Sequence, residues 1–257
     1  MAIATAYKAI NMNTGSFVDD DQATYIGDYQ ITLQNGLEKQ NFYGKFYDSD
    51  FLPTGTVSKI NEYYSTSKLY EISGLSHDAY KIANYILGND FKGMLSYIFA
   101  GNDTFNGSAY SDVVNGYAGS DKLYGNAGSD VLNGGLGNDI LTGGAGRDIL
   151  TGSTGYDTFD FNSLTESGLT STTRDIITDF IRGQDKIDLR TIDANTATTS
   201  VNDTFTGLIS SSAAFSKAGQ LKITAGVLYL NTDSDSAAEM SIQLTGISSL
   251  ANSDFYL

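Results

Sequence analysis

The chain has 257 residues, no cysteine, and 15 Lys and Arg against 30 Asp and Glu, which gives a formal net charge of −15. This charge excludes the basic footprint that a nucleic-acid partner requires, and the lack of cysteine excludes disulfides, thiolate metal sites and cysteine nucleophiles. With 28 glycines and one proline, the composition excludes collagen and coiled coil, and no apolar window is long enough to span a membrane.

The first hundred residues predict a small α+β domain that begins with antiparallel strands. Apolar and aromatic residues alternate with polar ones between residues 25 and 33, as in a half-buried strand. Similar runs follow at Asn41–Tyr47, Thr56–Tyr64 and Lys68–Ile72. Eleven of the 17 tyrosines precede residue 100. They indicate either core packing between strands or a glycan-binding face, and the sequence leaves both open.

Two helices are expected at the end of this domain. Ser76 is a candidate cap for a helix that ends before Gly88, and His77 beside it is expected to cap or to face solvent. Apolar residues from Phe91 to Ile98 follow the i, i+3, i+4, i+7 spacing of a second helix. We expect this pair to dock as a cap on the segment that begins at residue 101.

An uninterrupted nine-residue repeat occupies residues 101–160. Its aspartates are Asp103, Asp112, Asp121, Asp130, Asp139, Asp148 and Asp157. A large apolar residue lies two positions after each aspartate, and glycines precede it at fixed offsets, as in Gly134-Gly135-Leu136-Gly137-Asn138-Asp139. Each unit predicts a glycine turn and a short strand, so that successive strands wind into a parallel solenoid with a narrow aliphatic core.

Stacking the strands about 4.8 Å apart would bring carboxylates of neighbouring coils together, where they repel each other. Ca²⁺ relieves this repulsion, because it is a hard cation that takes six to eight carboxylate and carbonyl oxygens. The repeat matches the nonapeptide G-G-x-G-x-D-x-U-x of calcium-binding solenoids. The segment therefore resembles the RTX family of calcium-binding β-roll proteins.

This resemblance implies that two nonapeptides form one coil and that each aspartate shares calcium with the aspartate 18 residues later. The implied pairs are 103 with 121, 112 with 130, 121 with 139, 130 with 148, and 139 with 157. It also implies ligation by the backbone carbonyls of Gly116, Gly119, Gly125, Gly128, Gly134, Gly137, Gly143 and Gly146. Tyr110 replaces a repeat glycine just before Asp112, so the pair of Asp112 with Asp130 is the weakest of the five.

Residues 161–257 predict a second, β-rich module that caps the roll. Apolar alternation indicates a hairpin over Leu221–Leu230 and a further strand from Met240 to Leu244. The acidic stretch between them, Asn231–Glu239, is either a polar turn or the start of a calcium loop.

Two segments of this module resemble the C-terminal module of serralysin-type metalloproteases and family I.3 lipases: Asp179–Leu189 and the terminal Asp254-Phe255-Tyr256-Leu257. The resemblance implies that Asp179 and Asp185 complete a calcium site with Asp157, for a total of about five to six ions. It also implies export through a type I secretion apparatus. This expectation agrees with the lack of cysteine and of a conventional signal peptide.

The expected fold is therefore mostly β: a parallel β-roll (101–160) with a small α+β N-terminal domain (1–100) and a β-rich C-terminal cap (161–257). The chain lacks His-Glu-x-x-His and Gly-x-Ser-x-Gly and has a single histidine, so we expect no catalytic residues of those classes. We expect a secreted, non-catalytic calcium-binding protein of a Gram-negative cell exterior, with a surface-layer, matrix or adhesion role. The alternative is a polysaccharide-active enzyme or glycan-binding module within residues 1–100.

Overall fold

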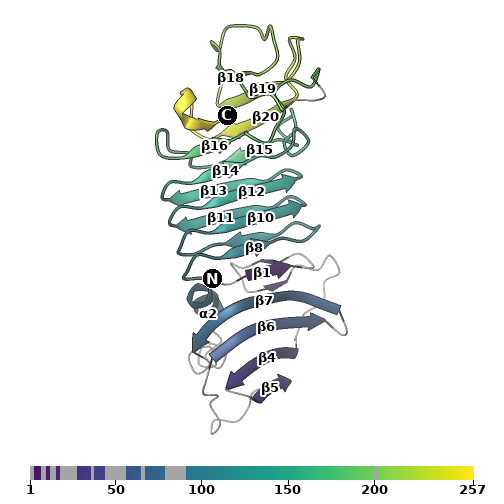
Figure 1. Ribbon diagram of the computed structural model, residues 1–257, viewed down its shortest axis with the longest axis vertical. Coiled ribbons are helices and arrows are strands. Elements are labelled where there is room, and N and C mark those ends of the chain that lie inside the picture. Colours follow the sequence, from purple (N-terminus) through teal and green to yellow (C-terminus); the bar gives the residue numbers. More distant parts are fainter. Residues whose placement is uncertain are drawn as a thin grey trace.

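The computed structural model describes residues 91–198 and 202–257 and, before them, the backbone of seven strands between residues 3 and 78. Its strands form two long sheets. The first sheet contains eleven strands in the order β21-β16-β14-β12-β10-β8-β1-β7-β6-β4-β5, and the second contains ten in the order β17-β18-β19-β20-β15-β13-β11-β9-β2-β3. Figure 1 shows the coils of the central part stacked along the long axis of the molecule.

The repeats form the predicted parallel roll. Strands of alternate repeats belong to alternate sheets: β8 (Thr104–Asn106), β10 (Lys122–Ala127), β12 (Ile140–Ala145) and β14 (Thr158–Asp160) in the first, and β9 (Val113–Asn115), β11 (Val131–Leu136) and β13 (Ile149–Thr154) in the second. Within each sheet, neighbouring repeat strands are parallel, and Leu123 lies opposite Leu141, 18 residues later. Two nonapeptides therefore make one coil, as the resemblance implies.

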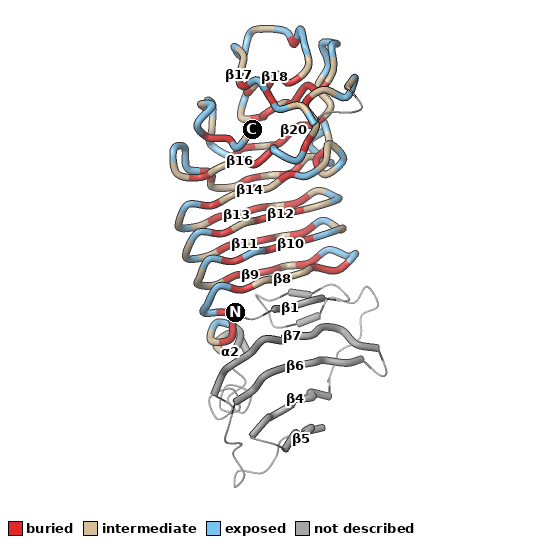
Figure 2. The backbone as a smooth tube through the Cα atoms, viewed as in Figure 1, coloured by how far each residue is buried: buried red, intermediate tan, exposed pale blue. Residues whose placement is uncertain are grey.

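The apolar residue two positions after each aspartate points into the roll. These residues are all at most 3% exposed: Phe105, Val114, Leu123, Leu132, Leu141, Leu150 and Phe159. Buried and partly exposed positions alternate along each strand, as Figure 2 shows for the stacked coils. The resulting aliphatic column confirms the predicted solenoid core.

The C-terminal module continues this column for another coil and then covers it. Strand β15 (Asp175–Ile177) pairs in parallel with β13, and β16 (Lys186–Asp188) pairs in parallel with β14. The remaining strands are β17 (Gly207–Leu208), β18 (Gln220–Thr224), β19 (Val227–Asn231), β20 (Met240–Leu244) and β21 (Phe255–Tyr256). The β18–β19 hairpin and the β20 strand confirm the predicted elements.

At the other end, the backbone of the N-terminal strands extends both sheets. The strands are β1 (Ile3–Ala6), β2 (Ile10–Asn11), β3 (Ser16–Phe17), β4 (Asp28–Asn35), β5 (Glu38–Tyr43), β6 (Thr56–Tyr64) and β7 (Ser67–Asp78). Strand β1 pairs in parallel with β8, and β4 to β7 pair antiparallel, as predicted. Helix α2 (Phe91–Ile98) is also present, and Ile98 and Phe99 at its end are buried in the core of the roll.

The predicted helix start at Ser76 is wrong. Strand β7 continues to Asp78, because its backbone pairs with β6 and places His77 opposite Val57. Strand pairing here overrides the local capping signal. Residues 79–90, which include the rest of that predicted helix, and the side chains of the tyrosine-rich segment lie outside the described residues.

Candidate calcium sites

The repeat aspartates form two columns, one along each set of loops. The first column contains Asp103, Asp121, Asp139, Asp157 and Asp185, and the second contains Asp112, Asp130, Asp148 and Asp175. Within each column the backbone N–H of one aspartate donates to Oδ1 of the aspartate one coil later, at 2.7–3.1 Å. The structure therefore brings together all five pairs that the resemblance to RTX proteins implies.

The second carboxylate oxygen of most of these aspartates has no donor. It is buried and without a hydrogen-bond partner in Asp121, Asp130, Asp139, Asp148 and Asp175. Asp112 differs, because its Oδ2 accepts hydrogen bonds from the backbone N–H and the hydroxyl of Ser108. A buried oxygen that carries charge and lacks a donor is strongly unfavourable unless a cation binds it. The donorless oxygens therefore fit a hard cation such as Ca²⁺.

Burial shifts the titration of these carboxyl groups. The pKa rises to about 8 for Asp175, to about 7 for Asp121 and Asp130, and to about 6 for Asp139, Asp148 and Asp157. Desolvation is the main cause, and it outweighs the lowering of the pKa by the N–H of the preceding coil. In Asp121 and Asp130 the charges of neighbouring aspartates raise the pKa further. A divalent cation between the coils would oppose both effects.

Repeat glycines keep the space beside each carboxylate free of side chain. A Cβ placed on Gly125, Gly134 or Gly143 would lie 2.3–2.4 Å from Oδ2 of the aspartate five residues later. Such a contact is far shorter than van der Waals distance. The glycine therefore leaves the donorless oxygen accessible to an ion.

The glycine carbonyls named as ligands lie between the coils. The carbonyl oxygens of Gly125, Gly134 and Gly143 face the glycine one coil earlier, and those of Gly119, Gly128 and Gly137 face the glycine one coil later. Gly116 and Gly146 lie in the same stacks, against the carbonyls of Gly134 and Gly128. At Gly125, for example, the Gly143 carbonyl oxygen and Asp130 Oδ2 both lie within 2.4 Å of the Cβ position. Carbonyl and carboxylate oxygens thus meet beside the glycine, which is the mixed donor set that Ca²⁺ prefers.

A side-chain ladder joins the coils next to the first column. The residue before each aspartate accepts a hydrogen bond from the backbone N–H of its counterpart one coil later: Asn102 from Ser120, Ser120 from Asn138, and Asn138 from Tyr156. These bonds hold adjacent loops in register independently of the carboxylates.

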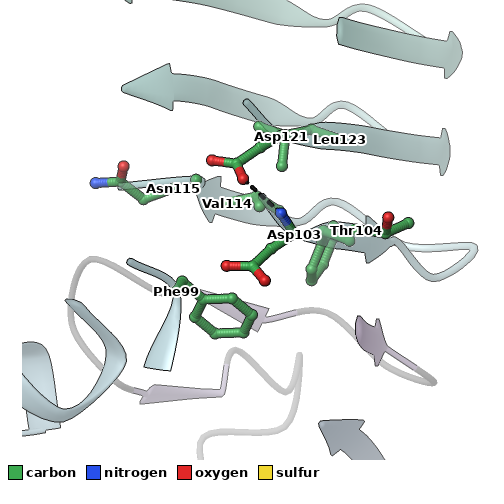
Figure 3. A pocket seen from close by; sticks show the side chains of 9 residues that line it. Phe99, Asp103, Thr104, Val114, Asn115, Asp121 and Leu123 are labelled. Atoms are coloured by element: carbon green, nitrogen blue, oxygen red, sulfur yellow. Dashed lines mark hydrogen bonds between the residues drawn. The ribbon is translucent and has the colours of Figure 1, made fainter. Parts of the chain in front are cut away.

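A small cavity marks the beginning of the first column. It measures about 10 Å³ and is lined by Phe99, Asp103, Gly116 and Asp121, among others. Figure 3 shows Asp103 and Asp121 beside it, joined by the hydrogen bond from the Asp103 N–H. Its volume is about that of one water-sized particle, so it has no room for an organic ligand.

At the C-terminal end, the structure brings Asp179 and Asp185 to the last repeat, and their completing a calcium site with Asp157 stays a prediction. Asp185 accepts hydrogen bonds from the N–H groups of Asp157 and Ile181. Asp179 accepts from the N–H groups of Gly152 and Ser153, and its charge raises the pKa of Asp157. Both carboxylates thus meet the last coil, although their oxygens already have donors.

Asp175 joins the second column although its sequence context did not predict a site there. This residue is fully buried, and it takes the position in the second column that a further repeat would supply after Asp148. The carboxylate of Glu166, on the loop before β15, raises the pKa of Asp175 by its charge. A signal was present, because Ile177 follows Asp175 at the two-residue offset of the repeats.

The acidic stretch before β20 forms a turn. Ligand atoms of Asp233, Asp235 and Glu239 lie within 4.8 Å of one another, and Asp235 is exposed. The Glu239 carboxylate accepts a hydrogen bond from the Thr232 N–H at 2.6 Å. Exposed acidic turns of this kind are common without an ion, so this group is not assigned to a site.

The raised pKa values predict how acid affects the calcium-free protein. Because the folded pKa of Asp130 is about 7 and its ordinary value is 3.8, the folded state holds the proton more tightly than the unfolded state. Protonation of Asp130 therefore stabilises the folded state, and this stabilisation is complete below pH 4 and is lost as pH rises through 7. When metal-stripped protein is heated and followed by circular dichroism, the β signal should therefore melt at a higher temperature at pH 5 than at pH 8, where it should be weak or absent before heating. A melting temperature that rises with pH would contradict this.

In saturating calcium the same comparison is expected to reverse, because protons then compete with the ion for the carboxylates. The calcium-loaded sample is thus the control for effects of pH elsewhere in the chain.

Comparison with known protein families places most of this chain in one family. The family described as peptidase M10 serralysin C terminal matches residues 94–257. A search of curated proteins found no match. Among solved structures, the AlgE6R3 subunit of the Azotobacter vinelandii mannuronan C5-epimerase is 29% identical to this chain. The match covers 61% of this chain and 78% of that subunit, with a TM-score of 0.29. The AlgE6R2 subunit of the same epimerase is 26% identical, and the match covers 61% of this chain and 88% of that subunit, with a TM-score of 0.32.

The family match covers more than half of the chain and includes every aspartate of both columns. Among the residues that the structure describes, no helix has both the length and the apolar character needed to cross a membrane. The chain therefore belongs to the peptidase M10 serralysin C-terminal family, and its stacked coils form a calcium-binding β-roll of the RTX type.

Proposed function

We propose that this chain is a non-catalytic, calcium-dependent module of an exported protein, which folds on calcium outside the cell. The observation that supports this most directly is the row of buried carboxylate oxygens without hydrogen-bond donors. These oxygens make the metal-free fold unfavourable, and a divalent cation would make it favourable. The fold would then depend on the calcium concentration around it.

The residues that would hold the ions are the aspartates of the columns with their neighbouring glycine carbonyls. The proposed carboxylate ligands are Asp103, Asp121, Asp130, Asp139, Asp148, Asp157 and Asp175. Calcium would supply positive charge and oxygen coordination between coils. Most of these aspartates face a coil on either side, so each ion would stabilise two coils at once.

The affinity expected of such sites suits folding outside the cell. Extracellular calcium modules bind with dissociation constants of about 10⁻⁴–10⁻³ M. Sites of this affinity stay empty in a low-calcium cytosol and fill outside. The unfolded chain can then pass through a type I secretion apparatus, and folding on the far side prevents its return. Such a module suits a surface-layer, matrix or adhesion component.

The terminal segment Asp254–Leu257 supports the link between folding and export. In the folded chain Asp254 is 1% exposed and accepts hydrogen bonds from Gly183 and Ala251. Phe255 and Tyr256 form β21, where Phe255 pairs with Ile187, so the middle of this segment is a strand of the roll's own sheet. A transporter that recognises these residues would need the unfolded chain.

Export of the full chain by a matched type I apparatus tests this function. Deletion of Asp254–Leu257 is expected to abolish secretion, measured as protein in the medium. A control variant, with the exposed Ser210, Ser211 and Ser212 replaced by alanine, should be secreted like the wild type. Normal secretion of the deletion variant would refute the role of this segment.

A further inference from the structure

The first loop of the second column, residues 107–112, differs from the loops that follow it. Its carboxylate, Asp112, accepts two hydrogen bonds at Oδ2, from the Ser108 N–H at 2.8 Å and the Ser108 hydroxyl at 3.0 Å. Ser108 is 7% exposed and Asp112 is fully buried. The oxygen that lacks a donor in most other loops is therefore satisfied within this loop.

Backbone conformation explains the difference. In the interior loops the residue four positions before the aspartate has a positive φ, which is 73° at Asn126, 103° at Gly135 and 93° at Gly144. Ser108, at the same position, does not have a positive φ. Its N–H points back to its own aspartate instead, and the loop closes on itself.

Tyr110 accompanies this change. In the interior loops a glycine lies two positions before the aspartate, and its φ is 132° at Gly128, 122° at Gly137 and 142° at Gly146. A tyrosine rarely adopts such a conformation. Tyr110 has no positive φ, and its N–H donates to the Ser108 hydroxyl at 3.0 Å. The two departures from the repeat thus support each other, because Tyr110 helps to orient the hydroxyl that donates to Asp112.

We infer that this loop is closed by hydrogen bonds in place of an ion, so that the pair of Asp112 with Asp130 holds no calcium. The Asp112 N–H still donates to Asp130 Oδ1 at 2.7 Å, so the first coil joins the second without a cation. Calcium in the second column then begins between Asp130 and Asp148. This inference rests on the proposed calcium binding of the other loops, and it makes the first coil the calcium-independent end of the roll.

Counting bound ions on the full chain tests the inference, by native mass spectrometry and by equilibrium dialysis with radioactive calcium. Asp112→Asn should bind as many ions as the wild type, whereas the matched variant Asp148→Asn should lose at least one. The double variant Ser108→Gly, Tyr110→Gly restores the repeat glycines and should gain one ion. This gain provides a second test if Asp112→Asn fails to fold.

The outcomes separate this inference from the proposed function. A wild-type chain that binds no calcium would overturn both. If the wild type binds calcium, the loss of one ion from Asp112→Asn would overturn the inference alone, and so would a glycine double variant that gains none.

Discussion

Calcium removal is expected to unfold the roll and the coil that follows it. If calcium is present at about ten times its dissociation constant, each site contributes RT ln 11, or about 1.4 kcal/mol. Five such sites contribute about 7 kcal/mol, which is comparable with the whole stability of a typical domain. In the metal-free state the donorless oxygens of Asp121, Asp130 and their neighbours also oppose folding.

Far-ultraviolet circular dichroism in EGTA, before and after addition of Ca²⁺, measures this effect at neutral pH. The β signal should be largely lost in EGTA and should return on adding Ca²⁺. Magnesium at the same concentration is the control, because Mg²⁺ retains its waters and demands a compact octahedral shell. An unchanged spectrum and melting temperature in EGTA would refute the dependence of the fold on calcium.

The second large effect is expected from Gly137→Ala. The φ of Gly137 is 122°, and a Cβ added there would lie 1.8 Å from the carbonyl oxygen of Gly119 in the preceding coil. The variant combines backbone strain with a clash against backbone atoms that cannot move without separating two coils. We expect a loss of about 3–5 kcal/mol in the free energy of unfolding.

Gly183→Ala is the matched control for this substitution. The φ of Gly183 is 76°, so alanine is strained there too, but a Cβ would meet nothing within 4 Å. Its expected cost is about 1–2 kcal/mol, which is the cost of the left-handed conformation alone. Urea unfolding of both variants in saturating calcium measures the difference. Equal losses would show that stacking between coils contributes nothing to the requirement for glycine.

The sequence predicted the roll well because its period is strict. A nine-residue repeat with two units per coil determines which aspartates meet, and the two-residue offset determines which side chains point inward, as for Leu132 and Leu150. Asp175 was missed because the loop between β14 and β15 breaks that period. It pairs with Asp148 at a separation of 27 residues, where the repeat would give 18.

The closure of the first loop was also beyond sequence reasoning. The presence of Tyr110 marked this loop as different, but the spacing of residues does not determine the φ of Ser108 or the direction of its hydroxyl. The same limit applies to the predicted helix at Ser76, where pairing between β6 and β7 outweighed a local capping preference. In each case a contact between distant segments, or the detailed path of the backbone, determined the structure.

The unbroken run of backbone-to-carboxylate hydrogen bonds along each column has a consequence for the shape of the calcium response. Within the columns, Asp121 Oδ1 accepts a hydrogen bond from the backbone N–H of the aspartate one coil earlier, and the Asp121 N–H donates to Oδ1 of the aspartate one coil later. Asp130 and Asp139 make the same two hydrogen bonds. A coil that loses its ion therefore loosens both of its neighbours. Nearest-neighbour coupling of this kind makes a solenoid order over a narrow concentration range. We therefore expect the roll to respond to calcium as a threshold element, with a Hill coefficient well above one in a calcium titration.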